Sequence, residues 1–137
     1  MSKKIFVNLP VKDLERSITF FGKLGYTFNQ QFTDEKAACM VVSEDIYVML
    51  LTEKFFKTFI NRDVADAHKM TEVLVCLNED SREAVDTHVE KALLAGATET
   101  REPQDHGFMY GRSFSDPDGH IWEIIWMDEA AVAGQGS

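Results

Sequence analysis

The chain has 137 residues, of which 45% are apolar and 27% are charged, and its formal net charge is −9. This length and this balance predict an ordinary globular protein, with one domain or two small halves that share a core. The acidic excess comes without any cluster of Lys and Arg. Nucleic acid and anionic membrane surfaces are therefore excluded as partners, and a cationic or neutral small molecule is easier to accept.

The amino-terminal residues MSKKIFVNLPVKD contain only a short apolar run before Pro10 and charged residues, which does not fit a signal peptide. No apolar stretch approaches the roughly 20 residues that a membrane-spanning helix needs. Cys39 and Cys76 lie in apolar, strand-like runs without CxxC spacing. This pattern predicts two buried thiols in a cytoplasmic protein, not a disulfide or a metal clip.

Residues 1–52 follow the order strand, helix and three strands. The segment KKIFVNLPV is a short apolar strand. Asp13 is placed to cap a helix that carries apolar residues at helical spacing and stops at Gly25. The segments YTFNQQF, AACMVVS and IYVMLLT then have the composition of three strands. We expect these residues to form one βαβββ module.

Residues 71–128 repeat this order. TEVLVCLN is a strand, and Asp80 opens a capping-box-like sequence that starts a helix ending at Gly96. A short strand near TETRE follows, and then the strands FMYGRSFS and HIWEIIWM, joined by DPDG. DPDG has its proline and its glycine where a tight turn needs them. This segment is therefore predicted to be a second βαβββ module.

The remaining residues connect and follow the two modules. Residues 53–70 contain EKFFKTFI, which is typical of a short amphipathic helix, and a polar linker; residues 129–137 are predicted to be a flexible tail. The repeat indicates an α+β fold of two tandem βαβββ modules. Since each module is too small to bury its apolar face alone, we expect them to pair into a curved eight-stranded cup with the helices on the outside.

Glu123 is the most informative residue of the last strand, because Ile121 and Ile125 are its neighbours on the same face. A buried carboxylate there needs a partner. Two interpretations remain open. Glu123 is either a metal ligand or general base inside the cup, or a hydrogen-bonded carboxylate at its rim.

Aligning the two modules assigns three more positions. The first strands pair Phe6 with Glu72, and the last strands pair Met49 with Glu123. If Glu72 and Glu123 both face inward within about 5–6 Å, they share a hard ion such as Mg²⁺ or Mn²⁺. Without an ion, repulsion raises the pKa of one of them and leaves an acid for proton transfer.

The segments LPVKDLERSITFFGKLGY and SDPDGHIWEI resemble the glyoxalase/bleomycin-resistance/extradiol-dioxygenase group, the vicinal oxygen chelate superfamily, and the resemblance covers roughly residues 4–127. It implies paired modules, a small-molecule ligand and a homodimer. In metal-using members it implies a divalent ion such as Mg, Mn, Zn or Ni at four strand positions, here Phe6, Met49, Glu72 and Glu123. Phe6 cannot ligate and Met49 offers only a thioether, so the ligand set is incomplete.

The resemblance therefore leaves two functions. The first is a glyoxalase-like enzyme, related to lactoylglutathione lyases, which acts on a small oxygenated substrate with a divalent metal held by Glu72 and Glu123. The second is a metal-free protein of the bleomycin-resistance type, which binds or sequesters a small molecule. In that case Phe6 and Met49 line the ligand site.

Three other side chains are candidates. His106, in QDHGFMYG, is either a base or substitute ligand on a loop over the cup, or a turn residue beside Gly107. Tyr110 and Arg112 share a strand face with Phe114. That face either binds a carboxylate or an aromatic group of the ligand, or packs against a helix or a subunit.

Overall fold

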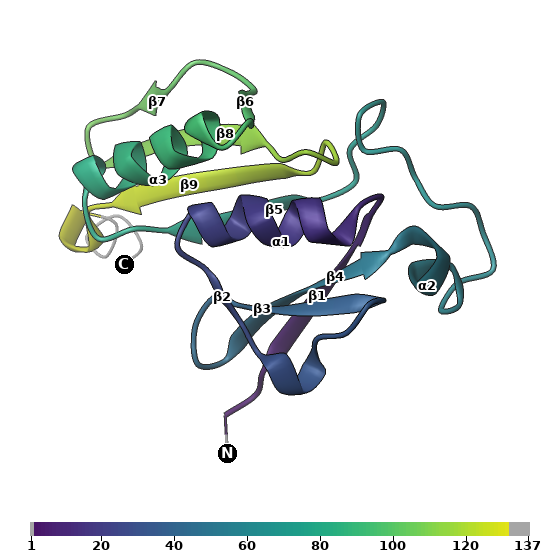
Figure 1. The fold of residues 1–137 in the computed structure, drawn as a ribbon. Coiled ribbons are helices and arrows are strands. Elements are labelled where there is room, and N and C mark those ends of the chain that lie inside the picture. Colours follow the sequence, from purple (N-terminus) through teal and green to yellow (C-terminus); the bar gives the residue numbers. More distant parts are fainter. Residues whose placement is uncertain (1, 132–137) are drawn as a thin grey trace. The chain divides into compact units, whose positions relative to one another are not determined.

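The computed structural model describes residues 2–131, and the chain divides into two compact units that join between Asp66 and Ala67 (Figure 1). The mixed α+β class is confirmed, with one sheet in each unit. The predicted pairing of the modules into a cup stays a prediction. Of the tail predicted over residues 129–137, residues 132–137 lie outside the described part.

The first unit is a four-stranded sheet of order β1-β4-β3-β2, with β1 parallel to β4 and a helix on one face (Figure 1). As predicted, Asp13 begins the helix by accepting a hydrogen bond from the Arg16 backbone N–H at 3.1 Å, and Gly25 follows its end with φ +102°. The elements are β1 (Ile5–Val11), α1 (Leu14–Lys23), β2 (Thr27–Phe28), η1 (Gln30–Phe32), β3 (Ala37–Val41), β4 (Ile46–Thr52) and α2 (Glu53–Lys57).

The prediction of one strand over YTFNQQF is wrong. Strand β2 ends at Phe28, and a 3₁₀ helix follows at once. The cause is Asn29, whose side-chain oxygen accepts the Gln31 backbone N–H at 3.0 Å. Such a local side-chain bond offers the backbone an alternative to the strand ladder.

The second unit is a sheet of order β5-β9-β8-β6, with β7 paired to β8 and α3 across one face (Figure 1). Strand β7 was not predicted, so this sheet has five strands instead of four. The helix cap is Ser81 and not Asp80, because the Ser81 hydroxyl accepts the Ala84 backbone N–H at 3.0 Å. The elements are β5 (Leu74–Asn78), α3 (Arg82–Leu94), β6 (Thr98–Glu99), β7 (Gln104–Asp105), β8 (Met109–Ser115) and β9 (Ile121–Met127).

Helix α3 covers the apolar face of this sheet. The core side chains here are at most 1% exposed, and burying each large one stabilises the fold by roughly 1.5–3 kcal/mol. Strand alternation sends every second side chain to the opposite face. That opposite face, which α3 does not cover, carries Glu123. The core residues between helix and sheet are Val85, Val89, Ala92, Phe114, Trp122 and Ile124.

The DPDG turn is built around a buried carboxylate, Asp116. One of its oxygens accepts the backbone N–H groups of Asp118 at 2.9 Å and His120 at 3.1 Å, and the other accepts the Trp122 indole N–H at 3.0 Å. The predicted turn is confirmed by the bond from the Gly119 N–H to the Asp116 carbonyl. Burial raises the pKa of Asp116 despite these three donors. The turn thus couples the hairpin to the core.

Candidate functional site

A pocket of about 240 Å³ lies on the face of the second sheet that α3 leaves uncovered. Glu123 occupies its centre by strand register, because Cys76 on β5 and Ser113 on β8 are its lateral neighbours. The pocket is formed within one unit. Its lining residues are Cys76, Arg101, Gln104, Met109, Gly111, Arg112, Ser113, Glu123 and Ile125.

The carboxylate of Glu123 is half-buried and loosely paired. Its side chain is 28% exposed, and its Oε2 lies 4.0 Å from a guanidinium nitrogen of Arg101. The Arg101 side chain is 62% exposed. An exposed pair of this length contributes at most about 1 kcal/mol. A cationic group from a ligand could therefore take the place of Arg101.

The prediction that both cysteines are buried is correct for Cys39 and wrong for Cys76, which is exposed. Cys76 lies on the edge strand β5, on the face away from α3. Desolvation of its sulfur and then the charge of Glu123 raise the pKa of the thiol. Cys76 is therefore a protonated thiol beside a carboxylate at neutral pH.

On the first sheet, the register does not place Phe6 beside Met49. Asn8 is the lateral neighbour of Met49, and Phe6 is the neighbour of Tyr47. The Phe6 ring is 50% exposed and stacks on Tyr47, with ring centroids 4.9 Å apart. Phe6 and Met49, which were both predicted to bind substrate, are thus offset by two residues in the register of β1 and β4.

Glu72 also lies away from Glu123. It is exposed and precedes β5, whereas Cys76 is the residue aligned with Glu123. Glu72 lies at a bend, two residues before β5 begins at Leu74. The register therefore does not bring the two glutamates together as a shared ion would require.

Tyr110 and Arg112 share a face, and that face is the one covered by α3. The Arg112 side chain is 9% exposed and binds Glu99 through two nitrogens at 2.9 and 3.1 Å, and Asp86 and Glu90 at 3.0 Å each. The Tyr110 hydroxyl donates to Asp86 at 2.6 Å, and this bond raises the pKa of the phenol. Their side chains join sheet to helix, and Arg112 is also among the residues that line the pocket of Glu123.

His106 is an exposed residue of the turn between β7 and β8. Its backbone N–H donates to the Met109 carbonyl at 2.8 Å, and Gly107 follows with φ +81°. His106 is not among the residues that line the pocket of Glu123. Its geometry matches the turn interpretation.

The donors near Glu123 do not fit a divalent cation. Its lateral neighbours offer a protonated thiol and a hydroxyl, and a guanidinium nitrogen of Arg101 lies 4.0 Å from its Oε2. Over residues 2–131, no three His, Cys, Asp or Glu side chains are grouped so that they could hold a metal ion. A hard ion needs several oxygen ligands at short distance, which this arrangement does not supply.

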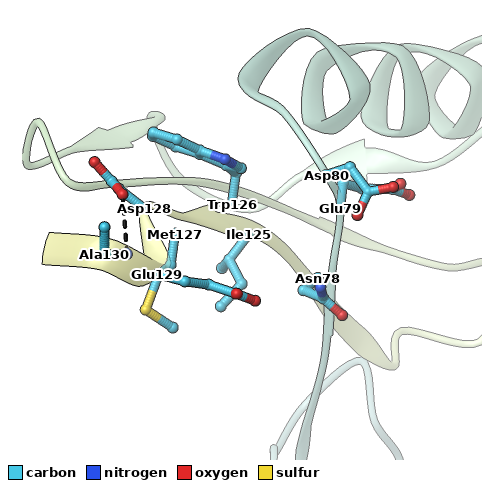
Figure 2. A pocket seen from close by; sticks show the side chains of 9 residues that line it. All are labelled: Asn78, Glu79, Asp80, Ile125, Trp126, Met127, Asp128, Glu129 and Ala130. Atoms are coloured by element: carbon cyan, nitrogen blue, oxygen red, sulfur yellow. Dashed lines mark hydrogen bonds between the residues drawn. The ribbon is translucent and has the colours of Figure 1, made fainter. Parts of the chain in front are cut away.

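A wider hollow of about 770 Å³ lies at the carboxyl ends of β5 and β9 (Figure 2). Glu79 and Asp80 extend from the β5 side and Glu129 from the segment after β9 (Figure 2). His88, whose side chain is 9% exposed, bonds to Glu79 at 2.8 Å. The lining residues are Asn78, Glu79, Asp80, Ile125, Trp126, Met127, Asp128, Glu129 and Ala130.

The β7–β8 turn is held by an ion pair between Arg82 and Asp105. Two guanidinium nitrogens of Arg82 contact the two carboxylate oxygens at 2.8 and 2.9 Å. These bonds, and then the backbone N–H of Gly107, lower the pKa of Asp105 from 3.8 to about 2. Because the pKa is depressed in the folded state, the pair's contribution to stability is present above pH 3.8 and is lost as the pH falls through about 2.

In Arg82→Met, we expect the pKa of Asp105 to rise from about 2 toward 3.8. The measurement is a carboxyl-carbon NMR titration of Asp105 between pH 1.5 and 6, roughly the range over which carboxyl groups titrate. Lys91→Met, which removes a cation from the same helix, should leave the midpoint in place. An unchanged midpoint in Arg82→Met would contradict the ion pair.

The chain has relatives of known structure over nearly its whole length. The family model for bleomycin resistance protein-like N-terminal regions matches residues 3–43. A hypothetical protein from S. aureus is 28% identical, with a TM-score of 0.78 over 92% of this chain and 94% of that one. A glyoxalase/bleomycin resistance protein/dioxygenase family enzyme from Burkholderia phytofirmans PsJN is 17% identical, with a TM-score of 0.76 over 92% and 99%.

The chain has the fold of the vicinal oxygen chelate superfamily. The resemblance inferred from its first helix and its last hairpin is thereby confirmed. The fosfomycin resistance protein FosX from Mesorhizobium loti shares this vicinal oxygen chelate fold, at 15% identity and a TM-score of 0.67 over 97% of this chain and 98% of that one. A search of curated protein sequences finds no significant match. Among residues 2–131, no helix is both long and apolar enough to cross a membrane.

Proposed function

We propose that the protein binds a small organic cation, without a metal, in the pocket around Glu123. The observation that carries this proposal is the setting of the Glu123 carboxylate, which is 28% exposed and lies 4.0 Å from a guanidinium nitrogen of Arg101. The bleomycin-resistance-like match over residues 3–43 and the net charge of −9 support it.

The pocket predicts the shape of the ligand. A planar amidinium or guanidinium group can bond to both oxygens of Glu123 as a fork, which is the strongest geometry for such a pair. Met109 and Ile125 supply apolar walls, and Gln104 supplies an amide. A volume of about 240 Å³ suits one ring with a charged substituent. Benzamidine has this chemistry and is therefore the first probe.

Glu123→Gln is expected to weaken benzamidine binding at least tenfold, because a charge-assisted bond is worth roughly 1.5–3 kcal/mol and 1.4 kcal/mol is tenfold. The measurement is a protein NMR titration that follows the backbone amides of Cys76 and Ser113. Glu83→Gln, an equal loss of charge at an exposed position of α3, serves as the control. Equal affinities in the two variants, or shifts that avoid this pocket, would refute the assignment.

The class of ligand and the absence of a metal are tested separately. Calorimetric titration with bleomycin asks whether the family resemblance extends to binding that drug. Elemental analysis of untagged protein asks whether a metal is retained. Near-stoichiometric metal that is lost in Glu123→Ala would overturn the metal-free proposal.

A second function is favoured by one observation, the protonated thiol of Cys76 beside the carboxylate of Glu123. These groups are a proton donor and a proton acceptor, as a glyoxalase-like reaction on a small oxygenated substrate requires. The test is isomerisation of the glutathione hemithioacetal of methylglyoxal, with and without added Ni²⁺, Zn²⁺, Mn²⁺ or Mg²⁺. Turnover that is lost in Glu123→Gln would rank this function first.

The homodimer implied by the resemblance stays a prediction. Size-exclusion chromatography with light scattering measures the mass in solution, and twice the 15.6 kDa of one chain is the expected result.

A further inference from the structure

Strand β7 carries one side chain to each face of the second sheet. It pairs with β8 through Gln104 opposite Gly111 and Asp105 opposite Tyr110. Because neighbouring residues of a strand point to opposite faces, Gln104 lines the pocket of Glu123 while Asp105 lies on the α3 side. A contact that fixes Asp105 on the α3 side therefore also fixes Gln104, which lines the pocket on the other side.

Arg82, at the start of α3, holds this strand by three kinds of contact. It bonds to both oxygens of Asp105, and one of the same nitrogens donates to the Gly107 carbonyl at 2.8 Å. Its guanidinium carbon lies 5.3 Å from the centre of the Tyr110 ring and 5.2 Å from that of Trp126. Arginine in a fork geometry above aromatic rings is pre-organised, and lysine cannot replace it.

Strand β7 is short and pairs with β8. It comprises two residues, and its turn is closed by the His106 N–H bond to Met109. So short a strand is marginal unless other contacts fix it. Gln104 is itself oriented, because its amide nitrogen donates to the Glu102 carbonyl at 3.0 Å. Its amide oxygen is thereby available to a ligand N–H group.

We infer that Arg82 is a positioning residue for ligand binding. It lies on the opposite face of the sheet and fixes β7, so that the Gln104 side chain is already oriented toward the pocket of Glu123 before a ligand binds. This inference rests on the proposed function. Ordering one side chain and its loop in advance saves the cost of ordering them on binding. Loss of Arg82 should therefore weaken binding about three- to tenfold, since immobilising one such side chain costs roughly 0.5–1.5 kcal/mol.

The binding test is a thermodynamic cycle with benzamidine as the probe. Its variants are Arg82→Met, Gln104→Ala and the double variant, with Lys91→Met as the matched loss of a cation from α3. The expected result is a three- to tenfold loss in Arg82→Met, no loss in Lys91→Met, and no additional loss when Arg82→Met is added to Gln104→Ala. A full additional loss in the double variant would overturn the route through Gln104.

Hydrogen exchange of the ligand-free protein supplies a readout that does not depend on binding. Amides of residues 104–107 should exchange at least tenfold faster in Arg82→Met and in Asp105→Asn, while those of β9 keep their protection. Faster exchange with unchanged benzamidine affinity would overturn the positioning role and leave the proposed function standing. If the unmutated protein does not bind benzamidine, the proposed function fails and this inference fails with it.

Discussion

Arg112→Met is expected to lower the free energy of unfolding by about 1–3 kcal/mol, because it removes a nearly buried cation and its charge-assisted hydrogen bonds to three partly exposed carboxylates. The guanidinium is 9% exposed and bonds to the carboxylates of Glu99, Asp86 and Glu90. Methionine has a similar length but brings no charge. The three carboxylates would then face one another without their cation. Urea unfolding followed by circular dichroism measures the loss.

Two further variants separate the charge from the packing of this cluster. Arg112→Lys keeps the charge but cannot form the two-pronged bond to Glu99, so an intermediate loss is expected. Adding Glu99→Gln to Arg112→Met should recover part of the stability, because one uncompensated charge is removed. A loss below about 1 kcal/mol in Arg112→Met would show that the cluster acts like an ordinary surface pair.

Gly119→Ala should cost about 2–5 kcal/mol, for two reasons. Gly119 has φ +89°, where a side chain costs roughly 1–2 kcal/mol. A Cβ at this position would also lie 2.7 Å from the backbone nitrogen of His68 and 2.8 Å from the carbonyl carbon of Ala67. Since backbone atoms cannot turn aside, the connector before β5 or the DPDG turn must move, at a further 1–3 kcal/mol or so.

Gly107→Ala is the matched control for this crowding. Gly107 has a similar φ of +81°, and a Cβ there would have no atom within 4 Å. Gly107→Ala should therefore lower the free energy of unfolding only by the cost of a side chain at positive φ, which is about 1–2 kcal/mol. The difference between the two unfolding free energies reports the close approach of the connector to the turn. Equal losses of unfolding free energy in the two variants would show that the segment at Ala67 and His68 moves away from the added methyl group without cost.

The local elements followed from short-range chemistry. Asp13 and the DPDG residues act on backbone groups within four positions, so the helix start and the turn could be predicted without knowing what packs on them. The cap of α3 was misassigned by one residue because Asp80 and Ser81 are adjacent and both suit an N-cap. Strand β7 was missed because two residues carry no periodic signal.

The candidate site was predictable in part. The strand pattern around Glu123 drew attention to the residue, and the structure places it in a pocket. Its neighbours were missed, although counting back from the DPDG turn pairs Ser113 with it. Aligning the modules through their true helix caps, Asp13 and Ser81, would have paired Asn8 with Cys76 instead of Phe6 with Glu72.

The sequence by itself determined the class of fold and the alternation of faces, because these depend on spacing and on residues close in the chain. Only the tertiary structure decided which partners the charged side chains have. Arg112 contacts carboxylates of α3 and β6, up to 26 positions away, and Glu123 contacts Arg101, which follows β6. Such pairs depend on strand register and helix placement, which are set by packing of the whole unit and leave no periodic mark in the sequence.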